Sequence, residues 1–146
     1  MRLLFSVFIC LFYFTVSSQQ TYVPDDNFEA YLETHDANGN VVAVGASNSM
    51  GDGIANNDSV TTANISGVGN LNISYKAISD LTGIEDFTAL ISLYCMDNQL
   101  TSLDVTQNTA LISLYCFDNQ LTSLDVTQNT ALNYLECFGN QLTSLD

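Results

Sequence analysis

Apolar residues recur with a fixed period through the second half of the chain. Residues 90–110 read LISLYCMDNQLTSLDVTQNTA, and residues 111–131 repeat them with one substitution. Residues 132–146 begin a further copy and do not complete it, while residues 68–89 form an earlier, divergent copy. A period of this length is the signature of a repeat protein in which each unit buries its apolar face against the next.

The first half of each unit has the pattern of a short strand followed by a turn. Leu93 and Cys95 alternate with Tyr94 and Met96, as in a strand with one buried face. An asparagine follows three residues after the cysteine, where an inward side chain can satisfy backbone N–H and C=O groups of the turn. We therefore predict parallel strands stacked across units and a buried asparagine ladder formed by Asn98, Asn119 and Asn140.

The second half of each unit echoes the first at an offset of ten residues. Leu103, Val105 and Asn108 correspond in this way to the leucine, cysteine and asparagine of the first half. This echo predicts a second short strand around Ser102 to Thr106, on the opposite wall of a flat, β-rich coil.

The region before the repeats predicts a short helix and a loop. Asp26 and Glu29 are spaced as in a capping box, which predicts a helix from about Asn27 to Glu33. One face of that helix carries apolar side chains that would cover the open end of the first repeat. These side chains are Phe28, Tyr31 and Leu32. Residues 35–59 are rich in Asn, Gly, Asp and Ser and are predicted to be loop.

These motifs carry a family resemblance. Residues 68–146 resemble bacterial leucine-rich repeats of 21 to 22 residues, and the three-residue spacing from Ile78 to Leu90 resembles that of internalins. Residues 21–67, which begin TYVPDDNFEAYLE, are similar to the N-terminal cap of such repeats in secreted proteins of Bacteroidetes-like bacteria. The resemblance implies a leucine-rich repeat solenoid, β-rich with parallel strands and a short N-terminal helical cap. It implies binding and surface display, with no catalytic residue to carry over.

The N-terminus predicts export. Arg2 precedes an unbroken apolar run over residues 3–16, and small residues follow at 16–18. A run of this length is too short to span a bilayer core of ~30 Å, so residues 1–18 are predicted to be a signal peptide rather than an anchor. The predicted organisation is then a cap at 19–67 followed by repeats at 68–89, 90–110, 111–131 and 132–146. The mature protein would be secreted or displayed at the cell surface.

The charge balance excludes two classes of partner. The sequence has sixteen acidic residues and only two basic ones, Arg2 and Lys76, which gives a formal net charge of -14. Binding to nucleic acid or to anionic lipid depends on Lys and Arg side chains, so neither partner is expected. The apolar content of 47% indicates a folded chain rather than an acidic disordered tail.

The sequence offers little for catalysis or for metal binding. His35 is the only histidine, no phosphate-binding or nucleophile motif occurs, and no cofactor is expected. We interpret His35 as a surface residue of a polar loop. Two oxygen-rich stretches give a weak calcium candidate, although both lack the final glutamate of an EF-hand, and metal-free turns explain the same composition. Its candidate ligands are Asp36, Asn38, Asn40, Asp52 and Asp58.

Three cysteines recur in register. Exported cysteines invite a disulfide or a metal site, but in-register side chains on neighbouring strands would need a strained bridge. A ladder of small buried side chains in place of leucine is the interpretation we favour. This cysteine ladder comprises Cys95, Cys116 and Cys137.

The outward positions of the strands are aromatic. Aligned aromatic side chains stabilise sheets by cross-strand packing alone, yet an exposed aromatic patch on a solenoid usually marks a binding surface. The candidate ligand-binding residues are Tyr94, Met96, Tyr115, Phe117, Tyr134, Glu136 and Phe138. On the other wall, Asp104, Asp125 and Asp146 form a column that we interpret as solubilising.

The sequence as a whole predicts a non-enzymatic recognition module for a protein, peptide or glycan. A passive spacer that displays a further domain or sorting signal is the alternative. An enzyme would need its chemistry in another part of the protein. Since no cap follows the last unit, we also expect a C-terminally truncated fragment whose Leu142 and Leu145 promote self-association.

Overall fold

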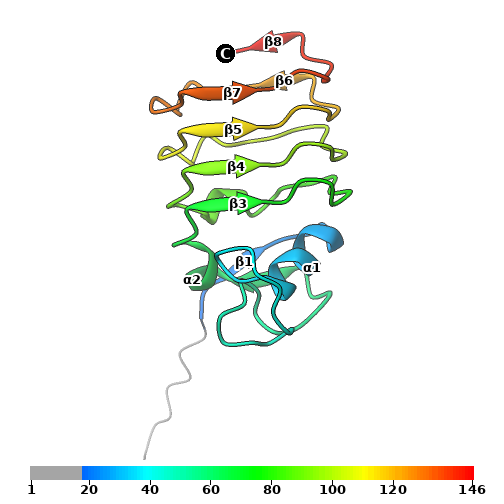
Figure 1. The fold of residues 1–146 in the computed structure, drawn as a ribbon, viewed down its shortest axis with the longest axis vertical. Coiled ribbons are helices and arrows are strands. Elements are labelled where there is room, and N and C mark those ends of the chain that lie inside the picture. The colour runs from blue at the N-terminus through cyan, green and yellow to red at the C-terminus, as the bar shows by residue number, and fades with distance from the viewer. Residues whose placement is uncertain (1–17) are drawn as a thin grey trace, which may run out of the picture.

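One strand from each repeat unit joins a four-stranded parallel sheet in the order β3-β4-β5-β7 (Figure 1). The computed structural model that shows this sheet describes residues 18–146, so the predicted signal peptide lies outside the described residues apart from Ser18. Residues 18–146 contain no helix with the length and hydrophobicity that a membrane crossing requires. The strands are β3 (Asn70–Asn72), β4 (Ser92–Tyr94), β5 (Ser113–Tyr115) and β7 (Tyr134–Glu136).

The register of this sheet follows the repeat period. Leu71 pairs with Leu93, Leu93 with Leu114 and Leu114 with Leu135, so the divergent first unit stacks on the others as the sequence predicts. The first three of these leucines are buried, and each contributes about 1.5–3 kcal/mol through removal of its side chain from water. Parallel strands and the leucine-rich repeat architecture are therefore both observed.

Asparagine side chains bond the units together behind the sheet. Asn119 Nδ2 donates to the carbonyls of Cys95 and Cys116 at 3.0 and 3.1 Å, and its Oδ1 accepts from Leu100 N at 3.0 Å. Asn98 and Asn140 make the equivalent bonds in their own units. Each asparagine thus supplies both donor and acceptor to backbone that turns inside the coil.

A second asparagine column lies in the other half of the units. Asn108 Nδ2 donates to the carbonyls of Ile84 and Phe87, and Asn129 Nδ2 donates to those of Val105 and Asn108. Both side chains are buried, and their Oδ1 atoms accept no hydrogen bond within residues 18–146. The second column therefore satisfies carbonyls only.

The predicted strand at 102–106 is wrong in that unit. Extended pairing on the opposite wall starts one unit later, where β6 (Ser123–Leu124) pairs in parallel with β8 (Ser144–Leu145). On the preceding unit the chain forms a 3-10 helix, η1 (Ile84–Asp86), entered through Gly83 at a φ of 101°. The residues before η1, which correspond to 102–104, form a turn and offer no extended edge, so 102–106 has no strand to pair with on that side. On the other side, residues of 102–106 and of 123–125 together line a recess of about 290 Å³.

The region before the repeats contains a strand pair and two helices. β1 (Gln20–Tyr22) pairs antiparallel with β2 (Ser59–Thr61), a pairing that the sequence analysis did not predict. The predicted helix is observed as α1 (Asp26–Thr34), and α2 (Thr62–Ile65) follows β2. Most of the segment from 35 to 59 is irregular, with turns, bends and the isolated bridges His35–Val41 and Asp36–Ser49.

The start of α1 differs from the predicted capping box. The N-cap residue is Asp25 rather than Asp26, and its Oδ1 accepts from Asn27 N and Phe28 N at 3.0 Å. Glu29 does not reach back to the N-cap. Its buried carboxylate accepts from the backbone of the loop at 57–58 instead, at 3.0 and 3.1 Å. A long-range loop contact therefore replaces the local one.

Helix α1 packs onto the first repeat. The Phe28 ring stacks on Phe87 with centroids 6.2 Å apart, and Asp25 Oδ2 accepts from Ser79 N and Ser79 Oγ at 2.8 Å. Phe28, Tyr31 and Leu32 are all buried. The function of residues 19–67 as a separate cap stays a prediction. At the other end of the stack, Leu142 is half-buried and Leu145 is 51% exposed.

Candidate functional site

The outward side chains of the main sheet form three columns that cross its strands. The register places Ser92, Ser113 and Tyr134 in the first column, and Tyr94, Tyr115 and Glu136 in the second. Met96, Phe117 and Phe138 follow two residues later in the third. All seven candidate ligand-binding residues therefore lie on one face, which we call the aromatic face.

Two pairs of rings stack across units on the aromatic face. The centroids of Tyr94 and Tyr115 lie 4.8 Å apart with the rings 5° from parallel, and those of Phe117 and Phe138 lie 4.6 Å apart at 9°. These separations match the spacing of neighbouring strands, ~4.8 Å, so the strand spacing determines the distance between the stacked rings. Tyr134 and Phe138 remain 62% and 60% exposed.

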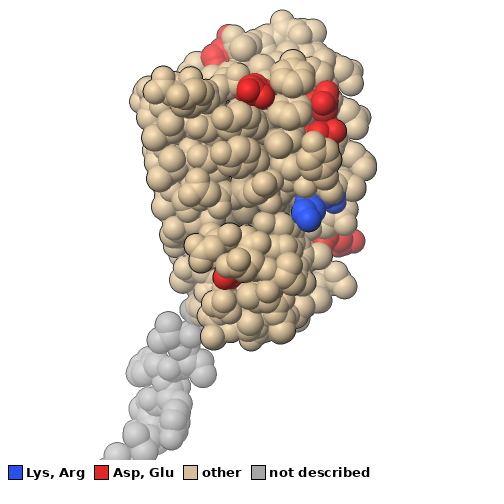
Figure 2. Space-filling model, in the orientation of Figure 1, with Lys and Arg blue, Asp and Glu red and all other residues tan. Residues whose placement is uncertain are grey.

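Most of the aromatic face is uncharged, and charged side chains lie around it. Figure 2 shows a largely uncharged surface over the strands, with acidic side chains toward its margin and Lys76 near the N-terminal region. Lys76 is the only Lys or Arg among residues 18–146. An uncharged aromatic centre with a polar margin is the composition of many binding surfaces.

An acidic recess borders the aromatic face where the strands end. Tyr75, Asp97 and Asp118 occupy equivalent turn positions with φ between 53° and 59°, in the left-handed region. The recess has a volume of about 460 Å³, and these three residues contribute to its lining. A hydrogen bond with Asp97, and then the charge of Asp97, raise the pKa of Tyr75 above its ordinary value. Sequence reasoning missed this recess, although the aspartate at a constant repeat position was its visible signal.

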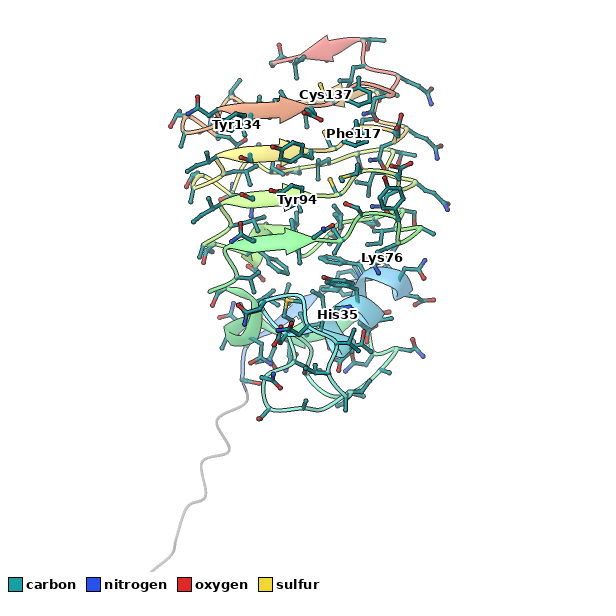
Figure 3. The ribbon with its side chains drawn as sticks, viewed as in Figure 1. His35, Lys76, Tyr94, Phe117, Tyr134 and Cys137 are labelled. Carbon is teal, nitrogen blue, oxygen red and sulfur yellow. The ribbon has the colours of Figure 1, made fainter. Side chains whose placement is uncertain are left out.

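A second recess lies between the helical region and the sheet. Its volume is about 430 Å³, and Tyr31, His35, Asn38, Lys76 and residues of the sheet line it. His35 stacks on Tyr31 at a centroid distance of 3.9 Å, and the Lys76 Nζ atom lies 5.4 Å from the centroid of the same ring (Figure 3). His35 Nδ1 is also 2.9 Å from the Tyr31 carbonyl oxygen at the end of α1. The histidine is thus half-buried on an aromatic ring rather than a residue of an open polar loop.

The cysteines stack in register, with unequal burial. Cys95 and Cys116 are fully buried, and Cys137 in the terminal unit is half-buried. All three are free thiols in the structure. Burial raises the pKa of Cys116 to about 12 and that of Cys95 well above its ordinary value. Burial and a raised pKa give the two inner thiols little nucleophilic character.

The calcium candidates bond to their own loops. Asp36 Oδ1 accepts from Asn38 N and Asn40 N at 2.9 Å, and Asp52 Oδ1 accepts from Ile54 N at 2.9 Å. These are the bonds of Asx turns. Residues 18–146 contain no group of three or more His, Cys, Asp or Glu side chains placed to hold a metal ion. Asp58, the remaining carboxylate candidate, has a φ of 56° and is exposed.

The aspartates of the opposite wall also form turns. Asp104 Oδ1 accepts from Thr106 N and Thr106 Oγ1, and Asp125 repeats both bonds with Thr127. These threonine hydrogen bonds lower the pKa of Asp104 and of Asp125 below the ordinary value. Both carboxylates are exposed, so this column carries negative charge at neutral pH.

Similarity to a solved structure decides the family. The functional domain of InlJ from Listeria monocytogenes, described as including a cysteine ladder, matches 88% of the chain with a TM-score of 0.69 and 34% identity. The chain is an internalin-like leucine-rich repeat protein. This internalin-like chain spans 26% of that InlJ structure. Internalin C2 from the same species matches 89% of the chain and 79% of its own length, with 18% identity and a TM-score of 0.43. No protein-family model and no curated protein matches the chain.

Proposed function

We propose that the protein is an exported recognition module, secreted or displayed at the cell surface, which binds a protein, peptide or glycan through its aromatic face. The internalin-like fold supports an interaction module, because solenoids present extended surfaces to partners. Export rests on the signal-peptide pattern of residues 1–18. The binding role requires no chemistry from His35, and the protein is proposed to be non-enzymatic.

One observation carries this proposal. The second ring stack ends in Phe138, and Tyr134 lies on the same face outside both stacks; these two rings are more than half exposed, and Tyr94, Tyr115 and Phe117 are partly exposed. Cross-strand packing accounts for the two ring stacks, but not for an exposed ring such as Tyr134 outside them. A contiguous aromatic surface left in water costs solvation free energy, and a ligand that covers it recovers that cost.

The experiment is a screen of the purified protein against peptide and glycan arrays, with two matched double variants. Tyr115→Ser with Phe117→Ser removes the centre of the aromatic face and is expected to abolish binding. Ile91→Ser with Ile112→Ser removes two side chains that are 43% and 39% exposed outside these columns, and it should leave binding intact. No hits would favour the passive spacer. A hit that survives the Tyr115 and Phe117 changes would place the site elsewhere.

We further propose that a polypeptide ending at Asp146 self-associates through its last unit. Leu145 is 51% exposed, and β8 has a strand partner on one side only within residues 18–146. An apolar, unpaired strand edge is a template for pairing with a second copy. Light scattering should detect dimers or larger species that Leu142→Gln with Leu145→Gln reduces. A monomer at high concentration in both proteins would contradict the proposal.

Cys95, Cys116 and Cys137 are proposed to form a structural ladder comparable with the one described for InlJ. The in-register spacing and the full burial of the first two support this role.

A further inference from the structure

The acidic recess beside the aromatic face has the chemistry of a receptor for a cationic side chain. Tyr75 is 69% exposed and contributes a ring, while Asp97 and Asp118 contribute carboxylates from the two following units. Lysine and arginine groups bind carboxylates through charge and hydrogen bonds, and they bind aromatic faces through the ring quadrupole. The recess offers both kinds of contact at one place.

Backbone hydrogen bonds hold the two turns that carry these carboxylates. Asp97 N donates to the Phe117 carbonyl at 3.2 Å, and Asp118 N donates to the Phe138 carbonyl at 3.0 Å. These bonds join each turn to the aromatic column of the next unit. In the last unit the equivalent residue is Gly139, where any side chain would overlap the Asp118 carboxylate. The glycine therefore leaves room for Asp118 to lie over the following turn.

The charge of the whole molecule points to the same class of partner. Residues 18–146 carry all sixteen acidic side chains against Lys76 alone. Lys76 lines the recess beside Tyr31 and His35, and is not among the residues that line the acidic recess. The net negative charge attracts a basic partner to the repeats and repels an acidic partner.

We propose that the aromatic face binds an extended, basic segment of a partner protein, with one lysine or arginine side chain seated among Tyr75, Asp97 and Asp118. This inference rests on the proposed function and adds the class of ligand. The partner's backbone and apolar side chains cover the stacked rings, and its cationic residue sets the register by entering the recess.

The test uses three labelled peptides of equal length, (Gly-Arg)6, (Gly-Gln)6 and (Gly-Glu)6, with fluorescence anisotropy as the readout. Only (Gly-Arg)6 is expected to bind, with an affinity that falls as salt rises from about 50 to 500 mM, because exposed charges are screened. Asp97→Asn with Asp118→Asn should lower that affinity about tenfold or more. Asparagine tolerates a positive φ, so these changes preserve the turns, which circular dichroism can verify.

The matched control removes the same charge elsewhere. Asp104→Asn with Asp125→Asn neutralises two aspartates on the opposite wall, and it should change the affinity by less than about twofold. Equal losses in the two double variants would overturn the proposal by assigning the attraction to net charge. Absence of (Gly-Arg)6 binding, or equal binding of (Gly-Gln)6, would overturn it too. An array ligand that depends on Tyr115 and Phe117 but not on Asp97 and Asp118 would leave the proposed function standing without this inference.

Discussion

The region before the repeats and the repeats themselves satisfy buried backbone groups with different chemistry. In the repeats the side chains are neutral amides, represented by Asn119, which bonds two carbonyls and one N–H group. In residues 18–67 they are carboxylates. Glu29 and Glu33 are each 1% exposed, and every bond they accept comes from a backbone N–H of the loop at 52–58.

The difference follows from what each side chain can do. An amide both donates and accepts, so one asparagine can join its own unit to its neighbours, and the arrangement repeats with the period. A carboxylate only accepts, so it collects successive N–H groups from a single loop, and that arrangement occurs once. The carboxylate also brings a charge into a buried place, which makes the stability of that region depend on pH.

The largest effect is expected from Asn119→Ala. It leaves the Leu100 N–H without its acceptor and removes one of the two asparagine donors from each of the Cys95 and Cys116 carbonyls. The loss of these three bonds should lower the free energy of unfolding in urea by about 3–5 kcal/mol. Asn129→Ala should cost less, about 1–3 kcal/mol, because the Asn129 Oδ1 atom already accepts no bond. Gln120→Ala, at an exposed neighbouring position, is the control and should change stability by under about 0.5 kcal/mol. Equal costs for the two asparagines would mean that the acceptor half of the ladder contributes nothing.

The repeats could be predicted further than the region before them. The asparagine positions and the register of Leu71 on Leu93 follow from periodicity, because identical units must stack alike. The strand predicted at 102–106 was wrong because strand pairing needs an extended neighbour, and the divergent first unit has a turn and η1 at the corresponding positions. A repeat pattern predicts the structure that its copies share. It does not predict the structure of the divergent unit on which the first copy stacks.

The burial of Glu29 and Glu33 could not be predicted at all. Their partners lie 19 to 29 residues away in a loop without periodicity. A glutamate on a short helix is usually solvent-exposed, so the pattern favoured the local capping role. The acidic recess was not predicted for a related reason. The alternation of apolar and polar residues predicts strands, but it does not predict the left-handed turns that position Asp97 and Asp118.

A smaller effect is expected from Glu29→Gln at neutral pH. Glutamine keeps one acceptor but presents an NH2 group to the second backbone N–H, so the free energy of unfolding should fall by about 1–3 kcal/mol. Glu136→Gln makes the same chemical change on an exposed residue of the aromatic face and should have little effect. If the two variants were equally stable in urea, the carboxylate would not be holding its loop.

The cysteines should show a smaller, graded effect along the stack. Cys116→Ser buries a hydroxyl in place of a thiol and is expected to cost about 1–3 kcal/mol, whereas Cys137→Ser should cost under about 1 kcal/mol because that site is half-buried. A thiol reagent should correspondingly label Cys137 in the native protein, and label Cys95 and Cys116 only after denaturation. Rapid native labelling of all three would contradict the burial gradient.

The smallest net effect is the pH dependence contributed by Asp25 and Glu33, because their shifts oppose each other. Burial acts to raise the pKa of Asp25, but hydrogen bonds from Ser79, Phe28 and Asp80 outweigh it and set the pKa below its ordinary value of 3.8. Burial raises the pKa of Glu33 above its ordinary value of 4.5, against the bonds from Asp52 and Gly53 that lower it.

A lowered pKa and a raised pKa contribute stability on opposite sides of the titration. The Asp25 contribution is present above pH 3.8 and is lost as the pH falls through the folded pKa, while the Glu33 contribution is present below pH 4.5 and is lost as the pH rises through the folded pKa. Urea unfolding measured from about pH 2.5 to 7 should show Asp25→Asn flattening the curve on the acid side only. Glu33→Gln should flatten it only above 4.5. Asn119→Ala, which removes no charge, should lower the whole curve without changing its shape. A change of shape in that variant would mean that the amide ladder of the repeats and the carboxylates before them are energetically coupled.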